Sequence, residues 1–285
     1  MTERESVLSL NDAANPLTLA AQSPGRFGAT IVTPREAGRQ AISVRNLSFS
    51  YKRIKAVDKL SLAVPQGISF GLLGPSGAGK TTLIRLLVGL ARPQGGTVRI
   101  LGKPPSRDNA HHIGYMPQLH SLYAELSVQQ NVDFFAQIYG LKDKSRRQRH
   151  VEHVIRLVGL WSRRRDSVHK LSGGMKQRVS LACAIVHYPR VIFLDEPTVG
   201  LDPDLRATFW RYFATLTKRG ITLVISSHTM DDAAHCDRLA FLRRGRVIAQ
   251  GSPDELRQAA GRPEATLEDA FLHFVHHAER GRRVK

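Results

Sequence analysis

A glycine-rich segment, followed at once by one lysine and two threonines, is the part of the sequence best suited to chemistry. It matches the pattern G-x-x-x-x-G-K-[ST] and consists of Gly74, Pro75, Ser76, Gly77, Ala78, Gly79, Lys80, Thr81 and Thr82. An apolar run typical of a buried strand (68–73) precedes it, and a helical pattern (80–90) follows it. Glycines let backbone amides surround phosphate oxygens, and the helix N-terminus adds partial positive charge. We therefore predict that this loop binds the phosphates of a nucleotide.

Two side chains at the end of this loop have separate predicted roles. Lys80 is expected to reach the terminal phosphates, and the hydroxyl of Thr81 is expected to hold Mg²⁺. The alternative is an ordinary glycine-rich turn, which the strand before the loop and the helix after it disfavour. Many unrelated nucleoside triphosphatases share such a loop, so it predicts phosphate binding and not a particular reaction.

Two adjacent acids, Asp195 and Glu196, form the second candidate for chemistry. They follow the apolar run 191–194, which has the length of a buried strand, and ligands of open α/β sheets collect at the carboxyl ends of strands. Asp195 is expected to bind Mg²⁺ through water, and Glu196 to take a proton from an attacking water molecule. A helix cap or a surface charge is the alternative, and the presence of a phosphate-binding loop disfavours it.

The segment 171–178, just upstream of that acidic strand, has the sequence LSGGMKQR. It resembles the signature motif of the ATP-binding cassette (ABC) family, although Met175 stands where a glutamine is common. The other motifs of the family follow in order along the chain: Tyr51, the phosphate loop, Gln118, the signature, Asp195 with Glu196, the run 200–203 and His228. The resemblance covers roughly residues 41–250, and it identifies the chain as similar to the ATPase subunits of ABC transporters.

The resemblance implies a role for each of these motif residues. Tyr51 is expected to stack on adenine, a contact that any aromatic ring can make. Gln118 is expected to approach Mg²⁺ and the attacking water. His228 is expected to contact the γ-phosphate and to help position Glu196, and Asp202 to communicate across a dimer. The implied activity is ATP hydrolysis, with ATP and Mg²⁺ as cofactors.

The signature motif has a role between subunits in this family. It meets the γ-phosphate bound to the opposite subunit, so that two copies enclose two ATP molecules. Ser172 suits a helix N-cap, and Gly173 and Gly174 permit close approach of backbone to an anion. We therefore expect these three residues to complete the site of a partner copy, in a homodimer that closes on ATP and opens after hydrolysis.

The elements expected to position these motifs are alternating strands and helices. Apolar patterns predict strands at 42–49, 56–64, 68–73, 97–101, 191–194, 222–226, 239–242 and 247–250, of which the last two form a hairpin. Helical patterns occur at 80–90, 128–139, 147–157, 174–187, 254–258 and 267–277. We predict an α/β fold: a P-loop NTPase core with a mixed, largely parallel sheet, an N-terminal antiparallel β region and an inserted helical subdomain.

Composition divides the 285 residues into three parts. Residues 1–40 lack periodicity and are expected to form a disordered extension. Residues 41–250 are expected to form the ABC ATPase domain, with the helical subdomain at about 119–180, and residues 251–285 a C-terminal helical tail. The two cysteines of the chain exclude a disulfide framework and fit a reducing compartment.

The formal net charge is +18, and residues 142–165 alone carry nine Lys or Arg against two acids. A solvated surface is one interpretation of this stretch. The resemblance offers another, because the helical subdomain of ABC transporters lies against the membrane subunits, near anionic headgroups. The sequence contains no apolar run long enough to span a membrane. We therefore expect a separate transmembrane permease as partner, and the cytoplasmic face of the cell membrane as location.

Two segments, 131–141 and 267–271, resemble the branch of the family that exports drugs, lipids or polysaccharides. An importer ATPase stays an alternative. A soluble ABC ATPase that acts on nucleic acid or the ribosome is another, which the positive charge keeps open. However, the interval from Gln118 to Leu171 is short and contains neither heptads nor cysteines, so no coiled coil or zinc module fits there. No nucleic-acid partner is expected.

Overall fold

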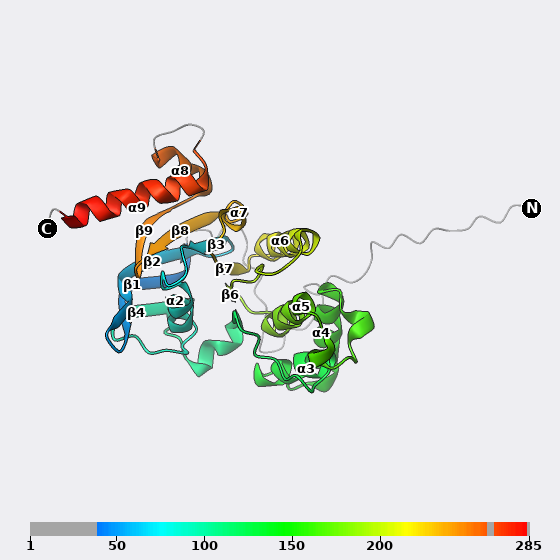
Figure 1. Cartoon of the computed structure of the whole chain (residues 1–285). Helices are drawn as coiled ribbons and strands as arrows, with labels where there is room; N and C mark the ends of the chain where they lie inside the picture. The colour runs from blue at the N-terminus through cyan, green and yellow to red at the C-terminus, as the bar shows by residue number, and fades with distance from the viewer. Residues whose placement is uncertain (1–38, 261–264, 284–285) are drawn as a thin grey trace, which may run out of the picture. The chain divides into compact units, whose positions relative to one another are not determined.

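The computed structural model describes residues 39–260 and 265–283 (Figure 1). The central layer of the protein is a six-stranded sheet with the order β5-β6-β7-β3-β8-β9. Its strands are Ile113–Met116 (β5), Val191–Asp195 (β6), Thr222–Ser227 (β7), Ser69–Leu73 (β3), Arg238–Arg243 (β8) and Arg246–Gly251 (β9). All neighbouring pairs are parallel except β8 and β9, which form the expected hairpin. The predicted mixed, largely parallel sheet is confirmed.

Three strands of this sheet end at the same edge. Strands β3, β6 and β7 are buried at every residue, as expected of parallel strands covered on both faces. In the register of the sheet, Leu73 at the end of β3 lies beside Ser227, and Asp195 at the end of β6 lies beside Ser226. The loops that follow the three strands therefore start close together.

A second sheet has three antiparallel strands in the order β2-β1-β4, which confirms the predicted N-terminal antiparallel region. Its strands are Gln40–Tyr51 (β1), Ile54–Pro65 (β2) and Gly95–Ile100 (β4). Strands β1 and β2 extend beyond the predicted bounds, because register shifts between them interrupt the strict alternation on which the prediction depended. Helix α2 (Lys80–Leu87) shares a hydrophobic core with this sheet, in which Ile42, Val57 and Leu83 are buried.

The predicted helical subdomain is confirmed and consists of Val128–Ile138 (α3), Lys144–Leu157 (α4) and Gly173–Ile185 (α5). Each helix begins after an N-cap residue whose side chain accepts a backbone N–H, namely Ser127, Asp143 and Ser172. Helix α4 begins three residues earlier than predicted because Asp143 caps it. An ion pair of 2.7 Å between Arg147 Nε and Asp133 Oδ1 joins α3 to α4. The exact bounds of the subdomain, 119–180, stay a prediction.

The sequence-based prediction lacks strand β5, helix α6 and four short helical segments of the described chain. Strand β5 has four residues, too few for a clear period. Helix α6 (Pro203–Lys218) did carry readable signals, since Asp202 caps it and a proline stands at its first position. Its buried residues also follow a helical spacing: Phe209, Trp210, Phe213 and Leu216. Short helical segments complete the described chain at Arg107–His112, Trp161–Arg163, Val168–Lys170 and Met230–Ala233 (α7).

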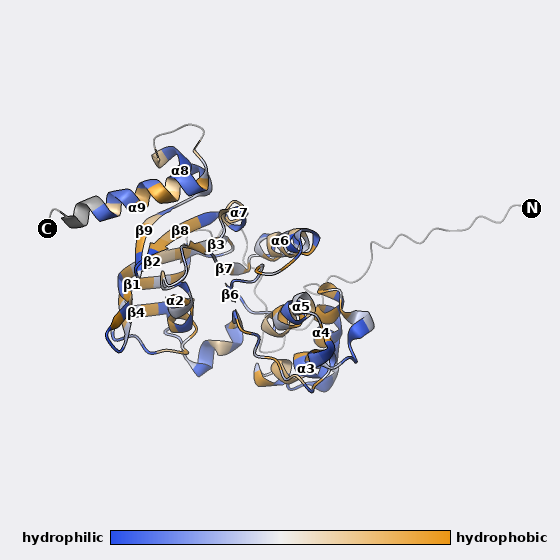
Figure 2. Cartoon of the chain, in the orientation of Figure 1, coloured by the Kyte–Doolittle hydropathy of each residue, from blue (hydrophilic) through white to orange (hydrophobic). Residues whose placement is uncertain are grey.

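The C-terminal region contains Pro253–Ala259 (α8) and Leu267–Arg283 (α9). Helix α9 is longer than predicted, and Figure 2 shows hydrophobic and hydrophilic residues along it. Its Phe271 and Phe274 pack against Phe241 of β8, with ring centroids 5.4 and 6.2 Å apart. Among the residues that the structure describes, no helix combines the length and the apolar character needed to cross a bilayer. Residues 1–38, most of the predicted disordered extension, lie outside the described residues.

Two partly buried histidines, His150 in helix α4 and His187 just after helix α5, are expected to make the fold sensitive to acid. His187 stacks on Tyr139 with ring centroids 3.7 Å apart, and its Nε2 lies 3.1 Å from Ile113 O. Burial lowers the pKa of His187 to about 3, and burial lowers the pKa of His150, whose Nδ1 lies 3.2 Å from Val186 O, to about 4. The unfolded chain, in which histidine has a pKa near 6.5, binds protons that the folded chain excludes.

We therefore expect the free energy of unfolding to fall as the pH drops below about 6.5, by up to about 1.4 kcal/mol per pH unit for each of the two histidines. Urea unfolding at a series of pH values between 7 and 4.5 measures this dependence. The His187→Phe variant, which keeps an aromatic ring against Tyr139 but cannot be protonated, should start less stable and show a shallower slope. An unchanged slope in this variant would show that His187 is not responsible.

Candidate active site

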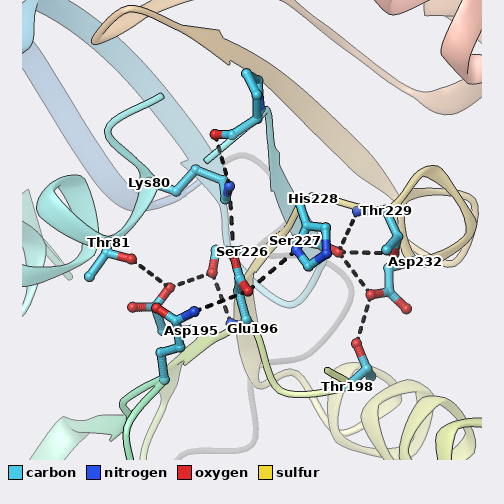
Figure 3. A network of polar contacts seen from close by, with 12 residues as sticks. Lys80, Thr81, Asp195, Glu196, Thr198, Ser226, Ser227, His228, Thr229 and Asp232 are labelled. Carbon is cyan, nitrogen blue, oxygen red and sulfur yellow. Dashed lines mark hydrogen bonds and ion pairs between the residues drawn. The ribbon is translucent and has the colours of Figure 1, made fainter. Parts of the chain in front are cut away.

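The structure brings the phosphate loop, the acidic pair and His228 together at one edge of the central sheet. The loop 74–79 follows β3, Asp195 ends β6, and His228 follows β7. Figure 3 shows the side chains of Lys80, Asp195, Glu196 and His228 pointing toward a common centre. Residues that the sequence places as much as 148 positions apart (80 and 228) therefore belong to one polar network.

The phosphate loop has a backbone shape that requires glycine at its end. Gly79, which directly precedes α2, has φ 105°, in the left-handed region that other residues rarely adopt. A Cβ at this position would also collide with the carbonyl oxygen of Ala56 on β2. The turn between β8 and β9 supports the same loop, because Gly245 N donates to Ala78 O at 2.9 Å.

Lys80 is held by its own loop. Its side chain is buried, and its Nζ donates to Gly74 O at 2.7 Å and to Pro75 O at 3.3 Å. The same Nζ lies 3.7 Å from Glu196 Oε1. Burial lowers the pKa of Lys80, and the charge of Glu196 opposes that shift. The ammonium group thus lies between the loop and the acidic pair, where it can contact a terminal phosphate.

Asp195 is only 1% exposed and has one carboxylate oxygen that is satisfied and one that is not. Its Oδ1 accepts hydrogen bonds from Ser226 Oγ at 2.6 Å and from Thr81 Oγ1 at 3.2 Å. Its Oδ2 is buried and has no hydrogen-bond partner among the described residues. Burial raises the pKa of Asp195, and the two hydrogen bonds oppose that shift. An unpaired carboxylate oxygen beside a threonine hydroxyl is a donor set that suits Mg²⁺.

Glu196 has a strained backbone and a carboxylate surrounded by site residues. Its φ of 53° is left-handed, a conformation that costs energy in residues other than glycine and occurs often at functional sites. Its Oε2 accepts a hydrogen bond from Gln118 Nε2 at 3.2 Å and lies 3.3 Å from His228 Nδ1. Its side chain is 11% exposed, so a water molecule bound beside it can transfer a proton to it.

Two further residues hold the backbone at Glu196 in place, and the sequence analysis gave neither of them a role. Ser226 Oγ accepts the N–H of Glu196 at 2.9 Å while it donates to Asp195. Gln177, on the helix that follows the signature serine, donates from Nε2 to Pro197 O at 2.8 Å. Their only sequence signals were a polar residue at the end of an apolar strand and a glutamine inside the signature segment.

The remaining predicted residues lie outside this network. Tyr51 ends β1, packs edge-on against Phe49 with centroids 4.9 Å apart and leaves 44% of its surface exposed. Ser172 is exposed and caps α5, and a Cβ on Gly173 would meet nothing within 4 Å. Asp202 caps α6 by accepting the N–H of Leu205 at 2.8 Å. Within the described residues, these motif side chains have no hydrogen bond or ion pair to Lys80, Asp195, Glu196 or His228.

Comparison with known proteins gives one family. The family model described as "ABC transporter" matches residues 57–199, a range that includes the phosphate loop, Gln118, the signature segment and the acidic pair. Tyr51, Asp202 and His228 lie outside the matched range, so their assignments depend on the order of the motifs and on the geometry above.

Relatives and a solved structure agree with this match. The chain is 38% identical over 245 residues to the probable multidrug ABC transporter ATP-binding protein YbhF of Escherichia coli. This alignment covers 84% of this chain but only 42% of that protein. The chain is also 38% identical over 253 residues to the Nod factor export ATP-binding protein I of Burkholderia orbicola, covering 84% of this chain and 82% of that one. A dimeric post-hydrolysis structure of the ATP-binding cassette MJ0796 with ADP and Pi has a TM-score of 0.69 and 25% identity, covering 74% of this chain and 98% of the other.

Proposed function

This chain belongs to the ABC transporter family, and we propose that it is an ATP-hydrolysing subunit of exporter type, whose ATP hydrolysis drives export through a separate membrane permease. The cargo class that we propose is a drug, a lipid or a polysaccharide-like molecule. The single observation that carries the hydrolytic part is the convergence of Lys80, Asp195, Glu196 and His228 at one sheet edge. The relatives named for multidrug and Nod factor export support the direction of transport.

The proposed nucleotide position follows from the groups at this edge. Backbone amides of loop 74–79 and the ammonium of Lys80 bind the phosphates of ATP, and the exposed ring of Tyr51 stacks on its adenine. The hydroxyl of Thr81 and the unpaired Oδ2 of Asp195 would hold Mg²⁺, and Gln118, which bonds the neighbouring Glu196, would approach the same ion. Mg²⁺ would neutralise charge that develops on the phosphate oxygens during transfer.

The proposed chemistry uses the carboxylate of Glu196 as general base. Glu196 takes a proton from a water molecule as that water attacks the γ-phosphorus, and the bond to the β-phosphate oxygen breaks, giving ADP and phosphate. His228, 3.3 Å from Glu196 Oε2, orients the carboxylate and contacts the γ-phosphate. Gln118, hydrogen-bonded to the same Oε2, orients the water.

We propose that two copies of the chain complete each other's sites. Ser172 and Gly173 are exposed at the N-terminus of α5, where backbone N–H groups and the helix dipole favour an anion. Among the described residues, no hydrogen bond or ion pair joins them to the phosphate loop of their own chain, and we propose that they bind a γ-phosphate held by a partner copy. Asp202, at the start of α6, would contact the partner as well. The similar cassette MJ0796 is itself dimeric with ADP and Pi.

We propose that the helical subdomain contacts the permease and the membrane surface, and that the protein works at the cytoplasmic face of the membrane. Exposed basic side chains follow one another along and beside α4: Lys142, Lys144, Arg149, Arg156, Arg163 and Arg165. Each such charge near an anionic leaflet is worth about 1 kcal/mol. The subdomain also exposes apolar side chains, among them Leu119 and Ile138, which suit a protein partner.

Affinity purification from solubilised membranes tests the transport assignment. We expect a polytopic membrane protein to co-purify in stoichiometric amount, and the pair reconstituted in vesicles to hydrolyse ATP faster than the chain alone. A Glu196→Gln preparation should recover the same partner without the stimulated hydrolysis, which separates assembly from catalysis. Recovery without any membrane protein, or association with ribosomes or DNA that survives physiological salt, would contradict the proposal.

A further inference from the structure

A buried carboxylate behind the active site connects three of the segments that carry site residues. Asp232, in the short helix α7, is 3% exposed. Its Oδ2 accepts hydrogen bonds from Thr198 Oγ1 at 2.7 Å and from Ser227 Oγ at 2.8 Å, and its Oδ1 accepts one from Trp210 Nε1 at 3.2 Å. Figure 3 shows Asp232 and Thr198 on the far side of His228 from Lys80. The carboxylate is therefore fully engaged by three donors.

The three donors come from different parts of the chain. Thr198 lies two residues after Glu196, and Ser227 directly precedes His228. Trp210 belongs to α6, the helix that Asp202 caps. The side chain of Asp232 thus joins the loop after Glu196, the loop that carries His228 and the helix that starts at Asp202.

The two serines at the end of β7 bond different partners on opposite sides of the strand. Successive side chains of a strand point to opposite faces, and the hydroxyl of Ser226 contacts Asp195 and the N–H of Glu196. The hydroxyl of Ser227 instead donates to Asp232 and accepts the N–H of Thr229 at 3.1 Å. The backbone on both sides of His228 is therefore tied to Asp232, whereas the His228 side chain is 43% exposed.

The left-handed backbone of Glu196 also depends on hydrogen bonds from neighbouring residues. A left-handed conformation in a residue other than glycine persists only when surrounding contacts fix it, and the hydrogen bond from Thr198 to Asp232 fixes the loop just after Glu196. An ionised carboxylate is costly to bury. Three hydrogen-bond donors stabilise the Asp232 carboxylate, and all three belong to segments that border the site.

We propose that Asp232 is a positioning residue for ATP hydrolysis, which sets the distance and orientation between Glu196 and His228 without touching the nucleotide. This inference depends on the proposed roles of Glu196 and His228. Asp232 contacts neither the phosphate loop nor Tyr51 through any hydrogen bond of the described residues. Its loss should therefore lower kcat and leave nucleotide binding nearly unchanged.

Steady-state ATPase kinetics and nucleotide titrations of Asp232→Asn and Asp232→Ala test the proposal. The asparagine keeps the size of the side chain but presents an amide N–H to donors, so we expect kcat to fall about 10-fold, and about 100-fold for the alanine, since a displacement near 1 Å has effects of this size. The nucleotide Kd should stay within about threefold of wild type, because binding energy that is equal in ground and transition states is untouched. A parallel loss of affinity, or wild-type kcat in the alanine variant, would overturn the inference.

Two further variants keep the test independent of folding. Asp237→Asn is the matched control. The Asp237 carboxylate likewise accepts hydrogen bonds, from N and Oγ of Ser69 at 2.7 Å each, but Ser69 begins β3, whereas the phosphate loop follows the other end of that strand. The Asp237→Asn variant should lower the unfolding temperature and leave kcat unchanged. Thr198→Val removes one of the three donors with little change in volume and should lower kcat in part, even if the Asp232 variants do not fold.

Single-turnover rates of His228→Ala with and without Asp232→Asn decide whether Asp232 acts through His228. Residues that act as a unit are not additive, so we expect the double variant to be no slower than His228→Ala alone. If the two effects multiply, Asp232 does not act through His228 and the inference fails. A Glu196→Gln variant with normal turnover would instead refute the proposed catalytic roles, and these two failures are distinguishable.

Discussion

Glu196→Gln is expected to keep ATP bound and to lower the hydrolysis rate by about 10²–10⁴-fold, the usual cost of losing a general base. Glutamine has the shape of glutamate and keeps an oxygen for the hydrogen bond from Gln118 Nε2, now 3.2 Å from Glu196 Oε2, but its amide cannot accept a proton from water. The phosphate loop and Lys80 are unchanged, so a nucleotide titration should give an affinity near that of wild type. Phosphate release measures the rate.

The control for this variant is a carboxylate of the same type far from the site. Glu255 belongs to the N-terminal capping box of α8, and Glu255→Gln should leave turnover unchanged. If Glu196→Gln hydrolyses ATP as fast as wild type, Glu196 is not the general base. A loss of nucleotide affinity in the same variant would show instead that the 3.7 Å contact between Glu196 and Lys80 shapes the phosphate-binding loop.

Ser172→Arg is expected to abolish the ATP-dependent dimer and, with it, nearly all hydrolysis. Ser172 is exposed at the N-terminus of α5, and a long side chain there would separate two copies at the point where the γ-phosphate of one is to meet the signature of the other. Light scattering after size-exclusion chromatography, with ATP and in the slowly hydrolysing Glu196→Gln background, measures the dimer. The arginine variant should stay monomeric and still bind ATP.

Ser172 also caps α5, because its Oγ accepts the N–H of Met175 at 3.3 Å, and loss of a cap costs about 1 kcal/mol. Ser172→Ala separates the two effects. It should lose the cap but still form a dimer with ATP. ATP-dependent dimerisation of the arginine variant would contradict the assignment of the signature to a partner's nucleotide.

The motifs of the active site were predictable because each is local. The phosphate loop, the acidic pair and the signature are contiguous in sequence, and the strands and helices beside them have clear periods. Helix α6 had local signals and was missed despite them, whereas strand β5 and Asp232 depend on contacts between residues that are far apart in the sequence. Strand β5 is defined by its pairing with β6 more than by its four residues. Asp232 has no local signal, because its three donors come from separate segments.

The geometry of the acidic pair also lies beyond sequence reasoning. Nothing local indicates that Asp195 Oδ2 is left without a partner or that Glu196 adopts φ 53°. The parallel register of β6 and β7 places Ser226 beside Asp195, so that one hydroxyl bonds both Asp195 Oδ1 and the N–H of Glu196. The roles of side chains could be proposed from residue types and the order of the motifs. The strained backbone of Glu196 and the unpaired oxygen of Asp195 become visible only in the folded chain.

The hairpin of β8 and β9 links the phosphate loop to helix α9. Gly245 N donates to Ala78 O at 2.9 Å at one end of this connection, and Arg243 pairs with Glu279 at 2.9 Å at the other. The phosphate loop and α9 are therefore joined through the two ends of one hairpin. Affinity tags, fluorescent labels or deletions introduced in that helix should be assayed for their effect on ATP hydrolysis before they are used as neutral handles.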